Sequence, residues 1–233
     1  MVRRTKEDAE QTRRQILEAT EKAFYERGVA GTTLADIAMI AGVSRGAIYW
    51  HFHNKADLLQ CLLASRQEPL SEIKKDDSLK EMRALLINFL KEVSTNPKTQ
   101  RLNEIFFHKL EQTNELLNLR AQRQHSLTTS HHHIQYALKN AIRLQQAPSN
   151  LNTALCAIYI NSYINGIVAQ WLLAPESFSL YETAEALVDI AVDMLKFSPT
   201  LCLRKNTEVT PRLISPLPSN SVTATSLPNK DTL

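Results

Sequence analysis

The residues best suited to recognise a ligand lie between positions 33 and 58. This segment reads as two short helices joined by a turn at Ala41-Gly42-Val43, which is the shape of a helix-turn-helix. Ile48 and Phe52 are four residues apart, so they would anchor one face of the second helix to a core. The exposed face then carries residues that are unusual on a purely solvated helix, namely Arg45, Gly46, Tyr49 and Trp50.

Such a face fits a helix that lies in the major groove of DNA. Arginine can donate two hydrogen bonds to guanine O6 and N7, so Arg45 is the expected base-reading residue, and Gly46 would let the backbone approach. Thr33 and Ser44 begin the two helices, where phosphate groups can bind. Further phosphate contacts are expected from Tyr49, His51 and Lys55, and from Arg3 and Lys6 in a basic N-terminal arm.

The rest of the chain carries no pattern typical of catalysis or metal binding. Cys61, Cys156 and Cys202 are far apart and in no metal-ligand spacing, which favours a reducing compartment over a disulfide framework. Three consecutive histidines at 131–133 would point about 100° apart on a helix and could not hold one ion. Because no catalytic set or glycine-rich phosphate loop is present either, the sequence predicts no metal, no cofactor and no enzymatic activity.

The composition predicts an all-α fold. The 233 residues include only five glycines, most of them before position 47, whereas β-hairpins use glycine at their turns. Pro69 would kink or end one of the expected helices, and residues 204–233 are expected to form a disordered tail. Capping signals and prolines divide the chain into the following expected helices: 8–27, 34–41, 45–51, 55–75, 79–95, 99–112, 115–146, 151–173 and 180–197.

Nothing in the chain predicts a membrane or an export signal. The N-terminus lacks an apolar signal-peptide region. The longest apolar stretch, 151–173, is interrupted by asparagines and a glutamine, so it reads as a buried helix and not as a membrane span. The net charge of +3 permits nucleic-acid binding without proving it. We therefore expect a cytoplasmic protein.

The segment 33–58 resembles the N-terminal domain of the TetR family of transcriptional regulators. The family's pattern recurs at Thr33, Ile37-Ala38, Ala41-Gly42-Val43-Ser44, Gly46, Tyr49, Phe52 and Lys55. The run from Arg45 to Phe52, the opening Arg3-Arg-Thr-Lys6, and the phrases Phe107-His-Lys109 and Trp171 to Phe178 are similar to the AcrR-type subgroup, which represses multidrug efflux pumps. The resemblance extends from residue 3 to about residue 203 and stops before the tail.

The resemblance implies a homodimeric repressor that binds a palindromic DNA operator. It implies a helix-turn-helix domain over residues 1–54, with its arm at 1–7, and a ligand-binding and dimerisation domain over 55–203. A small hydrophobic or cationic ligand would release the operator, and the controlled genes would form a multidrug efflux operon. The partners would thus be double-stranded DNA, a small-molecule inducer and a second copy of the chain.

A pocket for such a ligand would need aromatic walls and few polar groups. The helices 99–112, 115–146 and 151–173 are the expected location. The aromatic candidates are Phe106, Phe107, Tyr163, Trp171 and Phe178, and the polar candidates are Glu111, which could neutralise a cationic drug, and Gln170. Each aromatic could equally be an ordinary core residue, and Glu111 could equally face solvent.

The last two expected helices are apolar over more than one stripe. A helix that is apolar nearly all round is buried on both sides, here by its own core and by a partner subunit. A glycine inside a helix costs about 1 kcal/mol relative to alanine, so close packing of a neighbouring backbone would explain Gly166. The candidate dimer residues are Ile160, Ile164, Gly166, Ile167, Leu187 and Ala191.

Two alternatives remain open at this stage. A regulator of the same fold could control metabolism or biofilm formation and respond to a metabolite or a protein partner. In a different class, a helical ligand-binding or enzymatic protein could retain a helix-turn-helix that no longer binds DNA. Salt-dependent binding to a palindromic duplex would exclude the second alternative, because phosphate contacts impose a steep salt dependence.

Overall fold

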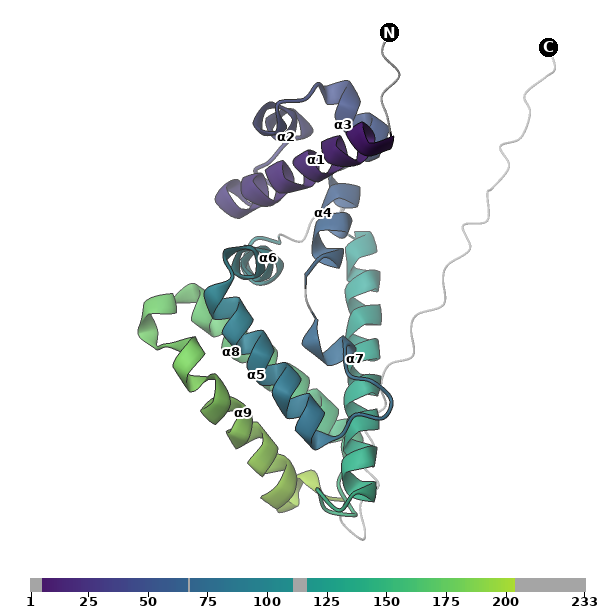
Figure 1. The fold of residues 1–233 in the computed structure, drawn as a ribbon, viewed down its shortest axis with the longest axis vertical. Coiled ribbons are helices and arrows are strands. Elements are labelled where there is room, and N and C mark those ends of the chain that lie inside the picture. Colours follow the sequence, from purple (N-terminus) through teal and green to yellow (C-terminus); the bar gives the residue numbers. More distant parts are fainter. Residues whose placement is uncertain (1–5, 67, 111–116, 204–233) are drawn as a thin grey trace, which may run out of the picture.

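The computed structural model describes residues 6–66, 68–110 and 117–203 of the chain. Within these residues the protein consists of α-helices and short 3₁₀ turns without a β-strand, which confirms the predicted all-α fold (Figure 1). The expected tail, Arg3 and Glu111 lie outside the described residues. The helices are α1 (Lys6–Arg27), α2 (Leu34–Ala41), α3 (Arg45–His51), α4 (Lys55–Ala64), α5 (Leu79–Thr95), α6 (Pro97–His108), α7 (Leu117–Arg143), α8 (Thr153–Leu173) and α9 (Leu180–Phe197).

Helices α1 to α4 form the part of the molecule that we call the head, at the top of Figure 1. Its core joins Ile16 and Phe24 of α1 to Ile37 of α2 and Ile48 of α3, all of them fully buried. Ile48 thus anchors α3 to the core of the head, as predicted. The apolar side of α4 also belongs to this core, through Leu58, Leu59 and Leu62.

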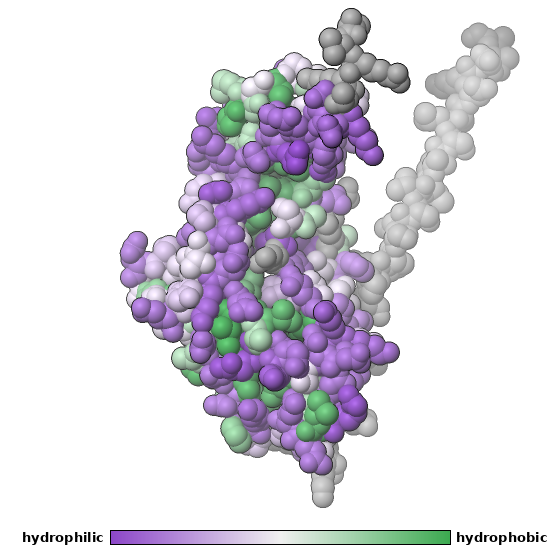
Figure 2. All heavy atoms as spheres, in the orientation of Figure 1, coloured by the Kyte–Doolittle hydropathy of each residue, from purple (hydrophilic) through white to green (hydrophobic). Residues whose placement is uncertain are grey.

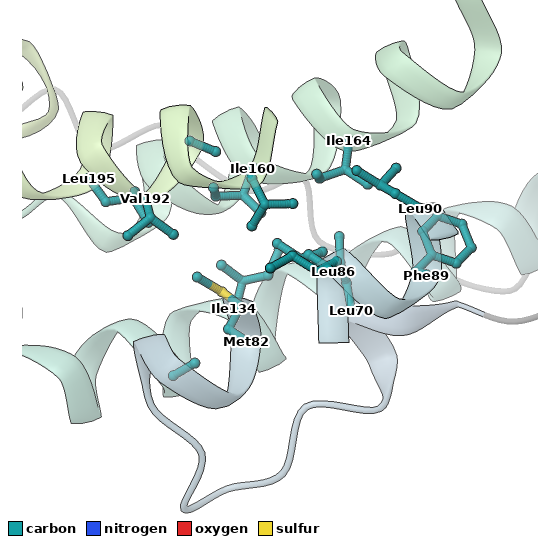
Figure 3. Close-up of a cluster of buried hydrophobic side chains, with 14 of the residues drawn as sticks. Leu70, Met82, Leu86, Phe89, Leu90, Ile134, Ile160, Ile164, Val192 and Leu195 are labelled. Carbon is teal, nitrogen blue, oxygen red and sulfur yellow. The ribbon is translucent and has the colours of Figure 1, made fainter. Parts of the chain in front are cut away.

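Helices α5, α7, α8 and α9 form a second unit, which we call the body. Figure 3 shows Leu86 and Leu90 of α5 facing Ile160 and Ile164 of α8 in its core, to which Ile134 of α7 also belongs. Two ion pairs fasten α9 along α5. Arg83 makes a bidentate ion pair with Asp189, in which Nε and one terminal guanidinium nitrogen donate to the two carboxylate oxygens at 2.6 and 2.9 Å. Lys91 Nζ lies 2.7 Å from Glu185 Oε1.

Several helix boundaries follow local signals closely. Helices α2, α3, α5 and α9 span the predicted ranges. Helix α4 ends at Ala64 and not at residue 75, and Pro69 begins a separate 3₁₀ turn, Pro69–Ser71, so this proline follows the end of the helix and does not kink it. Helix α6 begins at Pro97 because proline suits the first helical position, where the missing N–H has no partner to lose.

Candidate functional site

The turn between α2 and α3 has the geometry that a helix-turn-helix requires. Gly42 ends α2 with φ +66°, a left-handed conformation that glycine adopts without steric cost. Ser44 then begins α3, because its hydroxyl oxygen accepts a hydrogen bond from the Ala47 N–H at 3.2 Å. Phe52, which is buried in the head, ends α3 in an extended conformation. Both ends of α3 are therefore defined by residues of the predicted motif.

The outer face of α3 presents the predicted residues to solvent. Arg45, Gly46 and Tyr49 are exposed, and Trp50 is exposed to 71%. His51 differs, because its ring is half-buried and meets the Trp50 ring edge-on at 4.5 Å. The structure thus brings four of the predicted residues onto one accessible surface, which we call the α3 face.

Gly46 has no structural reason within the protein to be glycine. A Cβ atom built there would approach only the Ser44 hydroxyl oxygen, at 3.8 Å, and the backbone is not in the left-handed region. Neither crowding nor strain in the protomer therefore explains the missing side chain. The open space leaves room for the predicted approach of DNA to the α3 backbone.

The remaining predicted DNA contacts have different environments. Lys55 begins α4 and is half-buried, and Lys6 is exposed at the start of α1. Thr33 is exposed, but it donates both its N–H and its hydroxyl hydrogen to Asp36 Oδ2, at 2.9 and 2.6 Å. These bonds lower the pKa of Asp36, and the Arg27 guanidinium adds to the effect. Thr33 therefore begins α2 with its donors already used, so a phosphate would have to displace Asp36.

Helix α6 connects the head to the body. Its Leu102 and Ile105 are buried in the core of the head, whereas Phe107 packs against the core of the body. Arg101 pairs with Glu21 of α1 at 2.7 Å, and the Val29 N–H donates to the Lys109 carbonyl at 3.3 Å. On the opposite side, the His108 ring hydrogen-bonds the Ala169 carbonyl of α8 at 2.9 Å. Helix α6 therefore contacts both α8 and α1, so it can transmit a displacement of α8 to α1.

We expect an Arg101→Leu variant to lose about 1–2 kcal/mol of unfolding free energy. The Glu21 side chain is only 6% exposed, so its carboxylate would lose a counter-charge in a largely dry site, while the 39% exposure of Arg101 limits the loss through solvent screening. Urea denaturation measures the change, and Lys98→Leu on the exposed side of α6 is the control. Equal midpoints for Arg101→Leu and wild type would show that the pair contributes nothing.

The predicted pocket residues that the structure describes have different environments. Phe106 and Phe107 are half-buried and meet edge-to-face at 4.9 Å. Tyr163 instead links α8 to α9, because its hydroxyl donates to the Leu187 carbonyl at 3.1 Å. Trp171 is buried, and its indole N–H donates to the carbonyl of Phe178, itself half-buried, at 3.2 Å. The Tyr163 bond thus joins the middle of α8 to α9, and the Trp171 bond holds the end of α8 against the segment before α9, while Gln170 is exposed.

The predicted dimer residues divide into two groups. Ile160, Ile164 and Ala191 are buried in the core of their own body, so they cannot contact a partner, and this part of the prediction is wrong. Gly166 is exposed with open space around it, and Ile167 and Leu187 are half-buried. The predicted set does not include the large apolar side chains of α8 and α9 that the structure leaves exposed, which are Leu173, Tyr181, Ile190, Met194 and Phe197.

Other residues have ordinary roles. The three histidines have different surroundings, since His131 is buried, His132 is exposed and the His133 ring hydrogen-bonds the Ser71 carbonyl at 2.8 Å. Burial raises the pKa of the Cys156 thiol to about 12, so this cysteine is a core residue and not a reactive thiolate. Among the described residues, no helix combines the length and apolarity that a membrane span needs.

Comparison with known proteins agrees with this geometry. The family "Bacterial regulatory proteins, tetR family" matches residues 16–62, and the family "MAATS-type transcriptional repressor, C-terminal region" matches residues 77–197. The HTH-type transcriptional regulator TtgR of Pseudomonas putida is 47% identical over 208 residues, which cover 86% of this chain and 99% of TtgR. AcrR of Shigella flexneri is 35% identical over 86% of this chain and 97% of its own length.

A solved structure leads to the same conclusion. NalD, described as the secondary repressor of the MexAB-OprM multidrug efflux pump in Pseudomonas aeruginosa, superimposes with a TM-score of 0.73 at 30% identity, over 83% of this chain and all of NalD. The predicted resemblance is thereby confirmed over both the head and the body. The chain belongs to the TetR family of bacterial transcriptional regulators, in its AcrR-type subgroup.

Proposed function

We propose that this repressor binds a palindromic operator as a homodimer and controls a multidrug efflux operon. The α3 face carries the proposal, because it combines an arginine, two exposed aromatic rings and an accessible backbone at Gly46 on a helix anchored from behind. The relatives named above support the choice of target genes, since NalD is described as an efflux-pump repressor. The head would be the DNA-binding domain, and it extends past the expected boundary at residue 54 because α4 packs in its core. The protein would act in the cytoplasm, where bacterial DNA is found.

The homodimer would place two α3 faces in successive major grooves, about 34–36 Å apart. Helices α8 and α9 support this part of the proposal, because they leave Ile190, Met194 and Phe197 exposed on a single stripe of α9 and Leu173 exposed on α8. Figure 2 shows hydrophobic side chains exposed among polar ones on the surface of the body. Burying such side chains between two copies would remove their apolar surface from water.

A ligand would release the operator by favouring a dimer with a different spacing of the α3 helices. A tenfold loss of operator affinity requires the ligand to prefer that state by about 1.4 kcal/mol. The contacts of α6 with α8 and α1 supply a route, together with α4, which begins directly after α3. A related precedent is SmeT, 25% identical to this chain, which was solved in complex with triclosan.

Selection of bound duplexes from random DNA tests the proposal. The expected result is a near-palindrome whose affinity falls steeply with salt, as phosphate contacts require. The selected site should occur near genes for an efflux pump, and its occurrence only near metabolic genes would favour the alternative regulator. Failure to enrich any sequence would contradict operator binding itself.

An Arg45→Ala variant should lose about 1–3 kcal/mol of operator binding at one base pair. The exposed guanidinium is the group on the α3 face that can read guanine, so the loss should disappear when that base pair is changed. Fluorescence anisotropy with single-base operator variants measures it. Arg143→Ala, an exposed arginine at the end of α7, is the control. Unchanged affinities of Arg45→Ala for operator and scrambled DNA would refute this role.

A further inference from the structure

Arg66 is a buried arginine at the junction of the head and the body. It follows the last residue of α4 by two positions, and its side chain is only 6% exposed. One guanidinium nitrogen donates to Asn103 Oδ1 of α6 at 2.8 Å, and another donates to Glu68 Oε1 at 3.1 Å. A buried guanidinium is costly unless its charge is compensated, so its other neighbours matter.

A second arginine shares the same aromatic ring. The Arg66 guanidinium carbon lies 3.9 Å from the centroid of the Phe106 ring, and that of Arg123, on α7, lies 4.4 Å from it. The ring attracts both cations through its quadrupole, but it is neutral and cannot cancel their charge. Phe107 stands edge-on to Phe106 and extends the aromatic surface.

Among the described residues, this cluster contains two arginines and one carboxylate. Within the described part of the chain, Glu68 is the carboxylate that pairs with Arg66, and no carboxylate pairs with Arg123. Burial lowers the pKa of both guanidinium groups; for Arg66 the Glu68 carboxylate opposes this effect, and the charge of Arg123 adds to it. Arg66 thus keeps its charge in a site where burial disfavours it, with Glu68 as its partner, whereas Arg123 beside it is exposed and has no such partner among the described residues. An added anion would interact favourably with both guanidinium groups.

We propose that Arg66, Arg123 and Phe106 bind an aromatic anion, a carboxylate or a phenolate, and that the inducer belongs to this class. The ring of such a ligand would stack beside the two phenylalanines, while its oxygen atoms accept hydrogen bonds from a guanidinium. The cationic class expected from the sequence depends on Glu111, which lies outside the described residues. The role as inducer rests on the proposed repressor function, whereas binding of the anion does not.

The location explains how this ligand would act. Arg66 directly follows α4, Phe106 belongs to α6 and Arg123 to α7, and these three helices meet between the head and the body in Figure 1. A ligand that draws the two arginines together would therefore pull on the chain that continues from the head. The head could then no longer keep the position at which the two α3 faces match the operator.

Calorimetric titration of the full-length protein with three matched probes tests the proposal. The probes are naphthalene carboxylate, its neutral carboxamide and its cationic aminomethyl derivative. The carboxylate is expected to bind about tenfold tighter than the amide, and the cation weakest, in line with the strength of charge-assisted hydrogen bonds. Arg123→Gln, at an exposed residue, should remove this preference by lowering the affinity for the carboxylate to near that for the amide. Arg143→Gln, on the same helix, should leave all three affinities unchanged.

Three outcomes would overturn the anion site: equal affinities for the carboxylate and the amide, a preference for the cation, or no saturable binding of the carboxylate. A carboxylate affinity unaffected by Arg123→Gln would overturn it too. Arg66→Lys keeps the buried charge and provides a second test of the preference for the carboxylate over the amide. Operator release is measured separately. Carboxylate binding without operator release would refute the inducer role alone. Operator release by neutral or cationic compounds only would also refute the role of this site in induction, but it would leave the proposed repressor function standing.

Discussion

A Gly46→Gln variant is expected to be more stable than the wild type and yet to bind operator about a hundredfold more weakly. The stability gain follows from helix propensity, since glycine inside a helix costs about 0.5–1 kcal/mol relative to residues that favour helices. The space at Gly46 is open, because only the Ser44 hydroxyl oxygen lies within 4 Å of the position that a Cβ atom would take. The new side chain therefore meets no obstacle within the protein.

The loss of binding follows from the same open space. A glutamine there would project from the α3 face between Arg45 and Tyr49 and hold the backbone away from the DNA. Loss of two base or phosphate contacts, at roughly 1–3 kcal/mol each, corresponds to about a hundredfold. Chemical denaturation and anisotropy on the selected operator measure the two effects, and Gly46→Ala should show the stability gain with a smaller loss of affinity. Operator binding equal to wild type would mean that α3 does not approach DNA at this residue.

Ile190→Glu is expected to convert the proposed homodimer into a monomer that loses most of its operator affinity. Ile190 is 53% exposed on α9, so a glutamate there is solvated in the monomer and costs the fold little. In a dimer the same carboxylates would be buried in an apolar contact beside Phe197, which is 76% exposed in the protomer, and burying an unpaired charge costs several kcal/mol. Without its partner, one α3 face would contact only one half-site.

Sedimentation at micromolar concentration measures the association state, and anisotropy measures the affinity for the full operator and for a half-site. Tyr136→Glu is the matched control, because Tyr136 is a comparably exposed apolar residue on α7, at 47%. The control should remain dimeric and bind as the wild type does. A dimer that survives Ile190→Glu would move the subunit interface away from this stripe of α9.

Helices α2 and α3 of the head could be predicted residue by residue because their signals are local. Thr33 and Asp36 form a reciprocal capping box within four residues, and Gly42 supplies a left-handed turn that few other residues tolerate. The repeat of Ile48 and Phe52 places the second helix against the core. Such interactions depend on neighbours in the chain, so the sequence displays both partners together.

The body was harder to predict because its helices are apolar on several sides. Ile160 and Ile190 are equally apolar in the sequence, yet one is buried within the protomer and the other is exposed. Which stripe of α8 or α9 faces inward depends on where α5 and α7 lie, and that arrangement is not encoded within either helix. The predicted pocket had the same difficulty, since Tyr163 and Trp171 serve the contact between α8 and α9.

The all-α fold, the helix-turn-helix and the identity of the residues on the α3 face follow from the chain's local patterns alone, because caps, turns and helical periodicity act over a few residues. The packing of the helices selects the apolar residues that remain exposed for a partner, and it brings Arg66, Phe106 and Arg123 together. Forty residues separate the first two along the chain and seventeen the last two. Contacts over such separations are made when helices pack, since packing chooses one face of each helix among several that the sequence allows.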